Sequence, residues 1–126
     1  MKTIILILTM FVTLPITAQT KIETFCLEND LTVSATKESY TIVKQTFTEQ
    51  ATMFPATYTY TIEATYTITD KEIKLITIKN TAVSNNGFIL DFENYRGALK
   101  ENITKKAWEK LKGNIHKRCQ TLIDKY

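Results

Sequence analysis

The stretch Thr57–Thr69, TYTYTIEATYTIT, constrains the fold more than any other part of the chain, because apolar and polar residues alternate through it without interruption. Alternation with a period of two predicts a β-strand with one buried face, since successive side chains of a strand point to opposite sides. At about 3.3 Å per residue the strand would be roughly 43 Å long, so we expect it to bend, bulge or divide. The face expected to point to the core consists of Tyr58, Tyr60, Ile62, Ala64, Tyr66 and Ile68.

Shorter alternating stretches before this strand predict further strands. Lys21–Cys26 is expected to be the first, and Leu31–Ala35 the second, after turn residues at Asn29 and Asp30. Residues 38–50 fit two structures: their apolar residues have helical spacing, whereas their threonines favour extended chain. The β-branched content makes a strand the preferred interpretation.

The chain after the long strand is typical of a β-meander. Asp70-Lys71 predicts a tight turn, and Glu72–Val83 then runs back with a change of phase at Leu75-Ile76. Either a β-bulge resets the register there or the strand is covered on both faces. The residues Ser84–Gly87 favour a hairpin turn, and Phe88–Tyr95 is expected to form the next strand.

Past Gly97 the period of the apolar residues changes from 2 to 3.6, which predicts a helix of about 22 residues capped by Asn102 or Thr104. Gly113 and Asn114 fall on its wet face. The predicted fold class is therefore α+β: a curved antiparallel sheet of about four to six strands, ending in a meander, packed against one long C-terminal amphipathic helix. The apolar stripe of that helix consists of Trp108, Leu111, Ile115, Cys119, Leu122 and Tyr126.

The N-terminus has the pattern of a secretory signal peptide. Met1-Lys2 is followed by an apolar run from Ile4 to Leu14, and then by the small-residue step Thr17-Ala18. We expect cleavage after Ala18, with residues 1–18 as the signal and residues 19–126 as a single small domain that is secreted or periplasmic. A membrane anchor is the alternative, but the apolar run is shorter than the ~20 residues that span a bilayer.

Cys26 and Cys119 lie near opposite ends of the expected mature chain. In an exported protein such a pair is typical of a disulfide, which in the chain-entropy model would stabilise the fold by about 4 to 5 kcal/mol. We therefore expect a Cys26–Cys119 bridge. There is no C-x-x-C sequence to favour a redox role.

Positive charge is concentrated in the last part of the chain: Leu99–Tyr126 has eight Lys and Arg against three Asp and Glu. Lys106, Lys110 and Lys117 are expected to form a basic ridge opposite the apolar stripe of the helix. Such a ridge could meet anionic lipid, polysaccharide or an acidic protein, although a charged outer face is also what any amphipathic helix needs. Nucleic acid is not an expected ligand, since no basic groove interleaved with aromatic residues is visible.

An aromatic patch is the second candidate binding surface. A sheet covered by one helix hides only part of a long strand, so we expect Tyr58 and Tyr60, beside Phe54, to project beyond the helix. Exposed aromatic clusters are typical of interfaces, because each ring can be buried on a partner while its hydroxyl stays hydrated. The patch would serve a protein or glycan partner.

Candidates for catalysis are few. His116 is the single histidine, and Asp91 with Glu93 is the one pair of carboxylates expected on a shared strand face. No phosphate loop, nucleophile elbow or dinucleotide fingerprint occurs, so no cofactor or metal is expected. Asn102-Ile103-Thr104 matches a glycosylation sequon. The sequence favours an exported non-catalytic domain that binds a protein, glycan or apolar ligand; the alternative is a small secreted hydrolase-type enzyme that uses the carboxylate pair.

Overall fold

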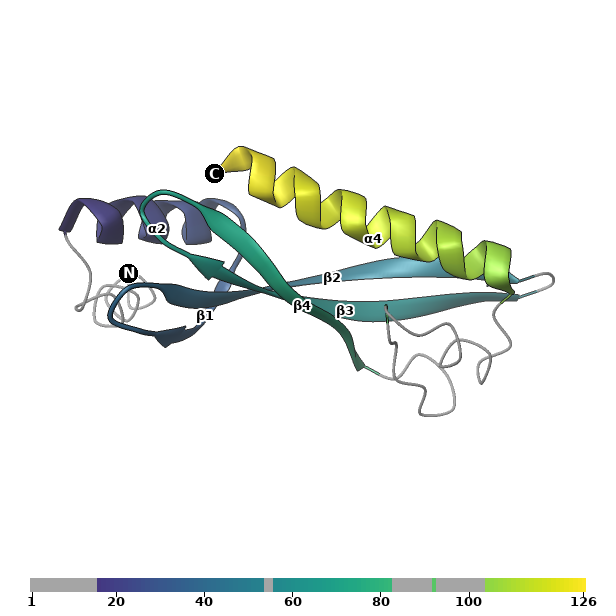
Figure 1. The fold of residues 1–126 in the computed structure, drawn as a ribbon. Coiled ribbons are helices and arrows are strands. Elements are labelled where there is room, and N and C mark those ends of the chain that lie inside the picture. The colour runs from purple at the N-terminus through teal and green to yellow at the C-terminus, as the bar shows by residue number, and fades with distance from the viewer. Residues whose placement is uncertain (1–15, 54–55, 83–91, 93–103) are drawn as a thin grey trace. The chain divides into compact units, whose positions relative to one another are not determined.

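The computed structural model describes residues 16–53, 56–82, 92 and 104–126 (Figure 1). The described elements are two helices and four strands. In chain order they are α2 (Ile16–Glu28), β1 (Thr32–Thr36), β2 (Thr41–Met53), β3 (Ala56–Ile68), β4 (Ile73–Ala82) and α4 (Lys105–Lys125). The predicted fold class is confirmed: a curved antiparallel sheet of four described strands is accompanied by a long C-terminal helix.

The strands follow one another in the sheet as they do in the sequence, in the order β1-β2-β3-β4. β1 and β2 are antiparallel, with Val33 opposite Val43 and Thr36 opposite Thr41, and their register shifts between Val33 and Ala35. Such a shift adds local twist to a pair of strands. The preferred strand interpretation of residues 38–50 is confirmed, since β2 covers most of that range.

β3 has the buried face that its alternation predicted. It is a strand of 13 residues, and its polar residues from Thr59 to Thr67 are exposed or half-buried. The side chains that alternate with them lose all contact with solvent, because they supply much of the core: Tyr60, Ile62, Ala64, Tyr66 and Ile68 are each 0% exposed.

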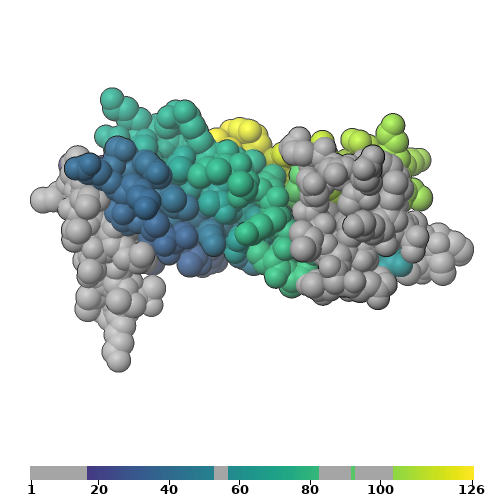
Figure 2. Space-filling model, turned by 60° about the horizontal axis from the view of Figure 1, so that its bottom comes forward, coloured from purple at the N-terminus to yellow at the C-terminus, as the bar shows by residue number. Residues whose placement is uncertain are grey.

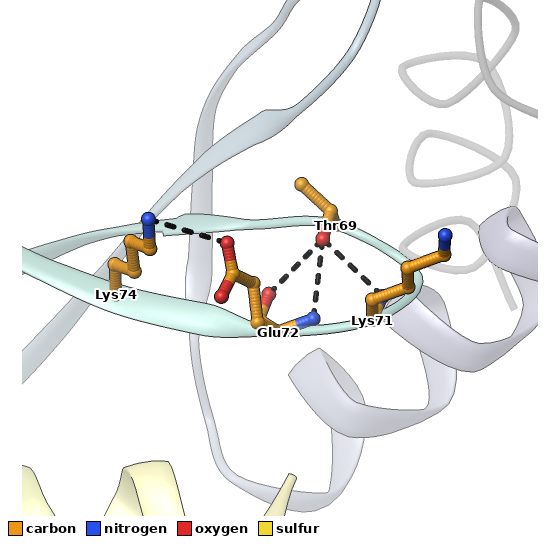
Figure 3. Close-up of polar contacts among 4 residues, drawn as sticks. All are labelled: Thr69, Lys71, Glu72 and Lys74. Carbon is orange, nitrogen blue, oxygen red and sulfur yellow. Dashed lines mark hydrogen bonds and ion pairs between the residues drawn. The ribbon is translucent and has the colours of Figure 1, made fainter.

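The tight turn predicted at Asp70-Lys71 is confirmed and is held by Thr69 (Figure 3). The hydroxyl oxygen of Thr69 accepts hydrogen bonds from the backbone N–H groups of Lys71 at 3.2 Å and Glu72 at 3.1 Å. The N–H of Thr69 donates to the carbonyl of Glu72 at 2.9 Å. A threonine side chain thus replaces a backbone acceptor at the turn, as hydroxyl residues often do.

β4 is mostly exposed, and the β3–β4 hairpin forms part of the surface drawn in Figure 2 (teal to green). Its inward positions change phase as predicted: Ile73 and Leu75 are the less exposed residues at the start, and Ile78 at the centre. Ile76, between them, is 50% exposed. The alternative that this strand is covered on both faces is therefore wrong. The predicted hairpin turn at residues 84–87 and the strand at 88–95 lie outside the described residues, except Phe92.

The predicted first strand, Lys21–Cys26, is wrong, because these residues belong to helix α2. Ile22, Phe25 and Cys26 are all buried, and Ala18 is buried one turn earlier, which is the i, i+4, i+7, i+8 spacing of a helix face. The short alternation of Ile22, Thr24 and Cys26 imitated a strand, but Thr24 is exposed.

Helix α2 ends in a turn at Asn29 and Asp30, and Asp30 has a left-handed backbone conformation. Asp30 has a φ of 54°, and the N–H of Leu31 donates back to the carbonyl of Cys26 at 3.0 Å. This hydrogen bond across six residues, with the buried Leu31 at its end, is the Schellman arrangement that closes many helices. The predicted turn at Asn29-Asp30 is thereby confirmed.

The described chain divides into two compact units. The first contains residues 16–45, 65–77 and 122–126, and the second contains the described parts of 46–64 and 78–121. The boundaries between the units fall inside β2, β3, β4 and α4. The single domain expected for residues 19–126 stays a prediction. Neither described helix is long and apolar enough to cross a membrane.

Candidate functional site

Helix α4 is positioned by the apolar stripe that its sequence predicted. Thr104 caps the helix, since the N–H of Ala107 donates to its hydroxyl oxygen at 3.1 Å. The stripe is fully withdrawn from solvent, with exposures of 0 to 3% for Trp108, Leu111, Ile115, Cys119 and Leu122. Because an α-helix turns 100° per residue, burying this stripe sends the opposite side of α4 into solvent.

The basic ridge predicted on that side is present. Lys106, Lys110 and Lys117 are all exposed, and Gly113 is exposed between them. Within the described part of the chain, none of these lysines makes an ion pair. From Lys106 to Lys117 the ridge covers about 16 Å along the helix axis, with the three lysines inside an arc of about 40°. It is a narrow row of positive charge, not a broad patch.

Arg118 belongs to the same helix but is used differently. Its guanidinium donates to the carbonyl of Thr48 at 3.0 Å and to the carboxylate of Glu49 at 3.1 Å. It also lies 4.5 Å from the centre of the Phe47 ring. These contacts attach α4 to β2 in the second unit, along which α4 runs (Figure 1). Arg118 is therefore part of the packing of the helix, and the ridge contains lysines alone.

A small hollow of about 80 Å³ lies where the ridge meets β2. Ala51 on β2 and Ala107 on α4 leave it open because their side chains are short, and Lys110 stands at its rim. The volume is well below the roughly 300 Å³ at which ligand pockets usually begin. We therefore treat it as a packing gap beside the ridge.

The aromatic patch is not present as predicted. Tyr60 is 0% exposed, so its assignment to an exposed binding surface is wrong: the buried face of β3 continues through Tyr60 and ends only at Tyr58. Tyr58 is half-buried, and Phe54 lies outside the described residues. One partly exposed ring does not make the apolar patch of a few hundred Å² that marks an interface.

The predicted disulfide is also wrong. No disulfide joins Cys26 and Cys119, and both side chains are 1% exposed. Burial raises the pKa of the Cys26 thiol to about 12, and the carboxylate of Glu23 contributes to this rise. Cysteine often fills a core position as a small apolar residue, and both residues lie on buried helix stripes, which explains their placement without a bridge.

A larger groove, of about 420 Å³, lies within the first unit between α2 and the end of the chain. Tyr126 forms one wall: its ring packs edge-on against Phe25 with centroids 4.8 Å apart, and its hydroxyl donates to the carbonyl of Thr69. The ammonium of Lys21 lies 4.3 Å above the same ring and donates to the carbonyl of Asp70 at 2.9 Å. The polar side of α2 completes the lining with Thr17, Thr20, Thr24 and Glu28, and Lys125 lies beside Tyr126.

This groove was not found from the sequence, because Lys21–Cys26 was interpreted as a strand. A helical interpretation would have placed Lys21, Thr24 and Glu28 on one face. The ammonium of Lys21 already has partners within the protein, however, since it donates to the carbonyl of Asp70 and lies over the ring of Tyr126. The pKa of Tyr126 is raised to about 12, chiefly by burial and next by the charge of Asp70. The contacts in the groove thus tie the end of the chain to α2 and to the β3–β4 turn.

The candidates for catalysis find little support. His116 is exposed, and its imidazole meets the edge of Phe92 with ring centroids 5.9 Å apart. Phe92 is buried and also packs on Trp108. Asp91 and Glu93, like Asn102, lie outside the described residues. Among the residues that the structure does describe, no three His, Cys, Asp or Glu side chains could share a metal ion.

Comparison of the chain with protein-family models, with curated proteins and with solved structures finds no match in any of the three. The case for a function therefore rests on the residues themselves.

Proposed function

We propose that this chain is an exported, non-catalytic binding domain that holds an anionic ligand on the basic ridge of α4. The observation that supports this is the arrangement of Lys106, Lys110 and Lys117. They lie in one exposed row, on the side of α4 opposite a stripe that is at most 3% exposed.

The charge of the ridge is available to a ligand. An acidic side chain paired with each lysine would neutralise the row, and Arg118 shows how such a pair is made in this chain, through Glu49. Within the described residues the three lysines have no comparable partner. Like charges aligned along a rigid helix raise the local concentration of anions and speed their association, an effect that salt screens.

The test replaces the ridge lysines together, as Lys106→Gln, Lys110→Gln and Lys117→Gln. Binding of the full chain to heparin, duplex DNA and phosphatidylglycerol vesicles is measured by titration calorimetry at low and at physiological salt. The triple variant should bind the best of these probes at least about tenfold more weakly, since each lost charge contact of this kind is worth about 0.5 kcal/mol. It should also lose most of the salt dependence.

A matched control changes the net charge equally elsewhere. Lys71, Lys74 and Lys79 are exposed on the β3–β4 turn and on β4, and their replacement by glutamine should leave the affinity within about twofold of the original. If both triple variants lose affinity equally, net charge and not the ridge attracts the ligand. If neither loses affinity, or if the unmodified chain binds none of the probes, the proposed function is wrong.

Export is the second part of the proposal, supported by the signal pattern of residues 1–18. Cleavage after Ala18 would remove the first three residues of α2, which begins at Ile16. The full chain should be expressed without an N-terminal tag, and the first peptide of the protein found outside the cytoplasm identified by mass spectrometry, which also detects Gln19 in its cyclised form. A first residue of Gln19 is expected, and an intact Met1 in the exported fraction would contradict cleavage.

A further inference from the structure

Gly113 is placed on the exposed side of α4 without a packing reason. It is exposed, and a Cβ atom built on it would have nothing within 4 Å. Glycine in the interior of a helix is less stable than alanine, because it loses more backbone freedom on folding. The described chain has room for a side chain at this position. Crowding by neighbouring atoms is therefore not the reason for glycine here.

Gly113 lies close to two of the ridge lysines. It lies three residues after Lys110 and four before Lys117, which places it between them along the axis and within about 60° of both around it. A ligand that reached from one ammonium to the other would pass between Gly113 and Asn114, over the space that the missing side chain of Gly113 leaves. Without a Cβ, the backbone of α4 can be approached there more closely than at any flanking residue.

We infer that Gly113 is a contact point for a linear acidic polysaccharide, which lies along the ridge against the helix backbone with its anionic groups on Lys110 and Lys117. This inference rests on the proposed function and names its ligand class. Charge complementarity is the first reason, since the ridge offers positive charge in a single row. The row matches a polymer whose anionic groups also repeat along one line.

A membrane fits this helix less well. An amphipathic helix that binds lipid inserts its apolar face between the headgroups and the acyl chains. The apolar residues of α4, such as Trp108, Leu111 and Ile115, are at most 2% exposed because they are already packed inside the protein. The apolar stripe of α4 is therefore not available to insert into a bilayer.

Phosphate-centred ligands such as nucleic acid also fit less well. Arginine is the residue that recognises phosphate in a bidentate manner, and single strands are held by bases stacking on exposed aromatic rings. On α4 the guanidinium of Arg118 is occupied by Thr48 and Glu49, and Trp108 is 2% exposed. Lysines alone supply charge without such geometry, which suits the dispersed charges of an acidic polysaccharide.

The test is Gly113→Ala in the full chain, with heparin and alginate as sulfated and carboxylated probes. Alanine should raise the thermal midpoint, because it favours the helix and its Cβ meets no atom. The same change should weaken polysaccharide binding by about threefold to tenfold, as the ligand is lifted from the backbone. A variant that folds better and binds worse excludes misfolding as the cause of the weaker binding.

Asn114→Ala is the matched control, since Asn114 is the next residue, is also exposed and flanks the line from Lys110 to Lys117 on its other side, where the change to alanine adds no bulk. It should likewise stabilise the helix and leave the affinity unchanged. If Gly113→Ala binds as tightly as the original chain while the lysine variant is weakened, the inference about Gly113 is wrong and the proposed function stands. Tighter binding of duplex DNA, an acidic peptide or anionic vesicles than of either polysaccharide would overturn the ligand class.

Discussion

The guanidinium of Arg118 on α4 lies 3.1 Å from the carboxylate of Glu49 on β2, and the two side chains are 47% and 14% exposed. The same Nη1 nitrogen also donates to the carbonyl of Thr48. Hydrogen bonds to charged groups are stronger than neutral ones, and partial burial of Glu49 reduces the screening of this pair by water. One side chain therefore makes several contacts that hold α4 on the sheet of the second unit.

Replacement of this arginine should destabilise the protein. Arg118→Met keeps most of the length of the side chain but loses the charge and both hydrogen bonds. We expect the free energy of unfolding to fall by about 1 to 2 kcal/mol, measured by urea denaturation followed by circular dichroism. Lys117→Met is the control, since Lys117 is an exposed neighbour, and its effect should stay within about 0.5 kcal/mol. Equal effects of the two substitutions would show that the contacts of Arg118 add nothing to stability.

The parts of the fold that could be predicted from the sequence are those whose period is long and uninterrupted. In β3 the alternation runs through 13 residues, and in α4 the apolar stripe runs through five turns, so a single wrong position could not reverse the interpretation. The N-terminal helix was missed because its pattern was cut short. Ala18, which begins its buried face, was assigned to the signal peptide, and what remained of the face had too few residues to show a period.

The candidate site was predictable only in part, for a related reason. Periodicity shows which side of an element is buried, so the exposed ridge of Lys106, Lys110 and Lys117 followed from the stripe opposite. It does not show where along the strand the covering element stops, so Tyr60 was placed outside the core. The role of Arg118 was equally hidden, since its partner Glu49 lies 69 residues away in the sequence.

Asp30 offers a way to stabilise the molecule. Its φ of 54° is left-handed, a conformation that costs an ordinary L-residue roughly 1 kcal/mol and glycine almost nothing. Its negative charge also lies at the C-terminus of α2, where the helix dipole disfavours it. Asp30→Gly should therefore raise the free energy of unfolding by about 0.5 to 1 kcal/mol in urea denaturation.

Two further substitutions separate these causes. Asp30→Asn removes the charge and keeps a residue that tolerates the left-handed region, so it should recover only the electrostatic part of the gain. Asp30→Ala removes the charge but not the backbone strain, and should be less stable than Asp30→Gly. An alanine variant as stable as the glycine variant would mean that the conformation of Asp30 carries no cost.

The state of the cysteines can be checked directly. Cys26 and Cys119 are not joined by a disulfide and are 1% exposed, and the pKa of Cys26 is raised to about 12, so its reactive thiolate is scarce at neutral pH. Both thiols should react with Ellman's reagent in urea without any reductant, and neither should react rapidly in the native protein. A cross-linked pair of peptides containing these two residues, found by non-reducing mass spectrometry, would contradict the structure.

Tyr126 should make stability depend on alkaline pH. Burial, with a further contribution from Asp70, raises the pKa of its phenol to about 12, against about 10 in an unfolded chain. Between these values the unfolded state releases the proton first, so the folded state binds more protons and its stability falls as the pH rises. The contribution of the Tyr126 phenol to stability is complete below about pH 10 and is lost by about pH 12.

The variant Tyr126→Phe tests this prediction. At pH 9 the original chain should exceed the variant in stability by about 0.5 to 1.5 kcal/mol, because the phenol hydrogen bond to Thr69 is present. Urea denaturation of the two proteins at intervals from pH 9 to 12 should show this difference shrinking. A difference that stayed constant over the range would mean that Tyr126 titrates alike in the folded and unfolded states.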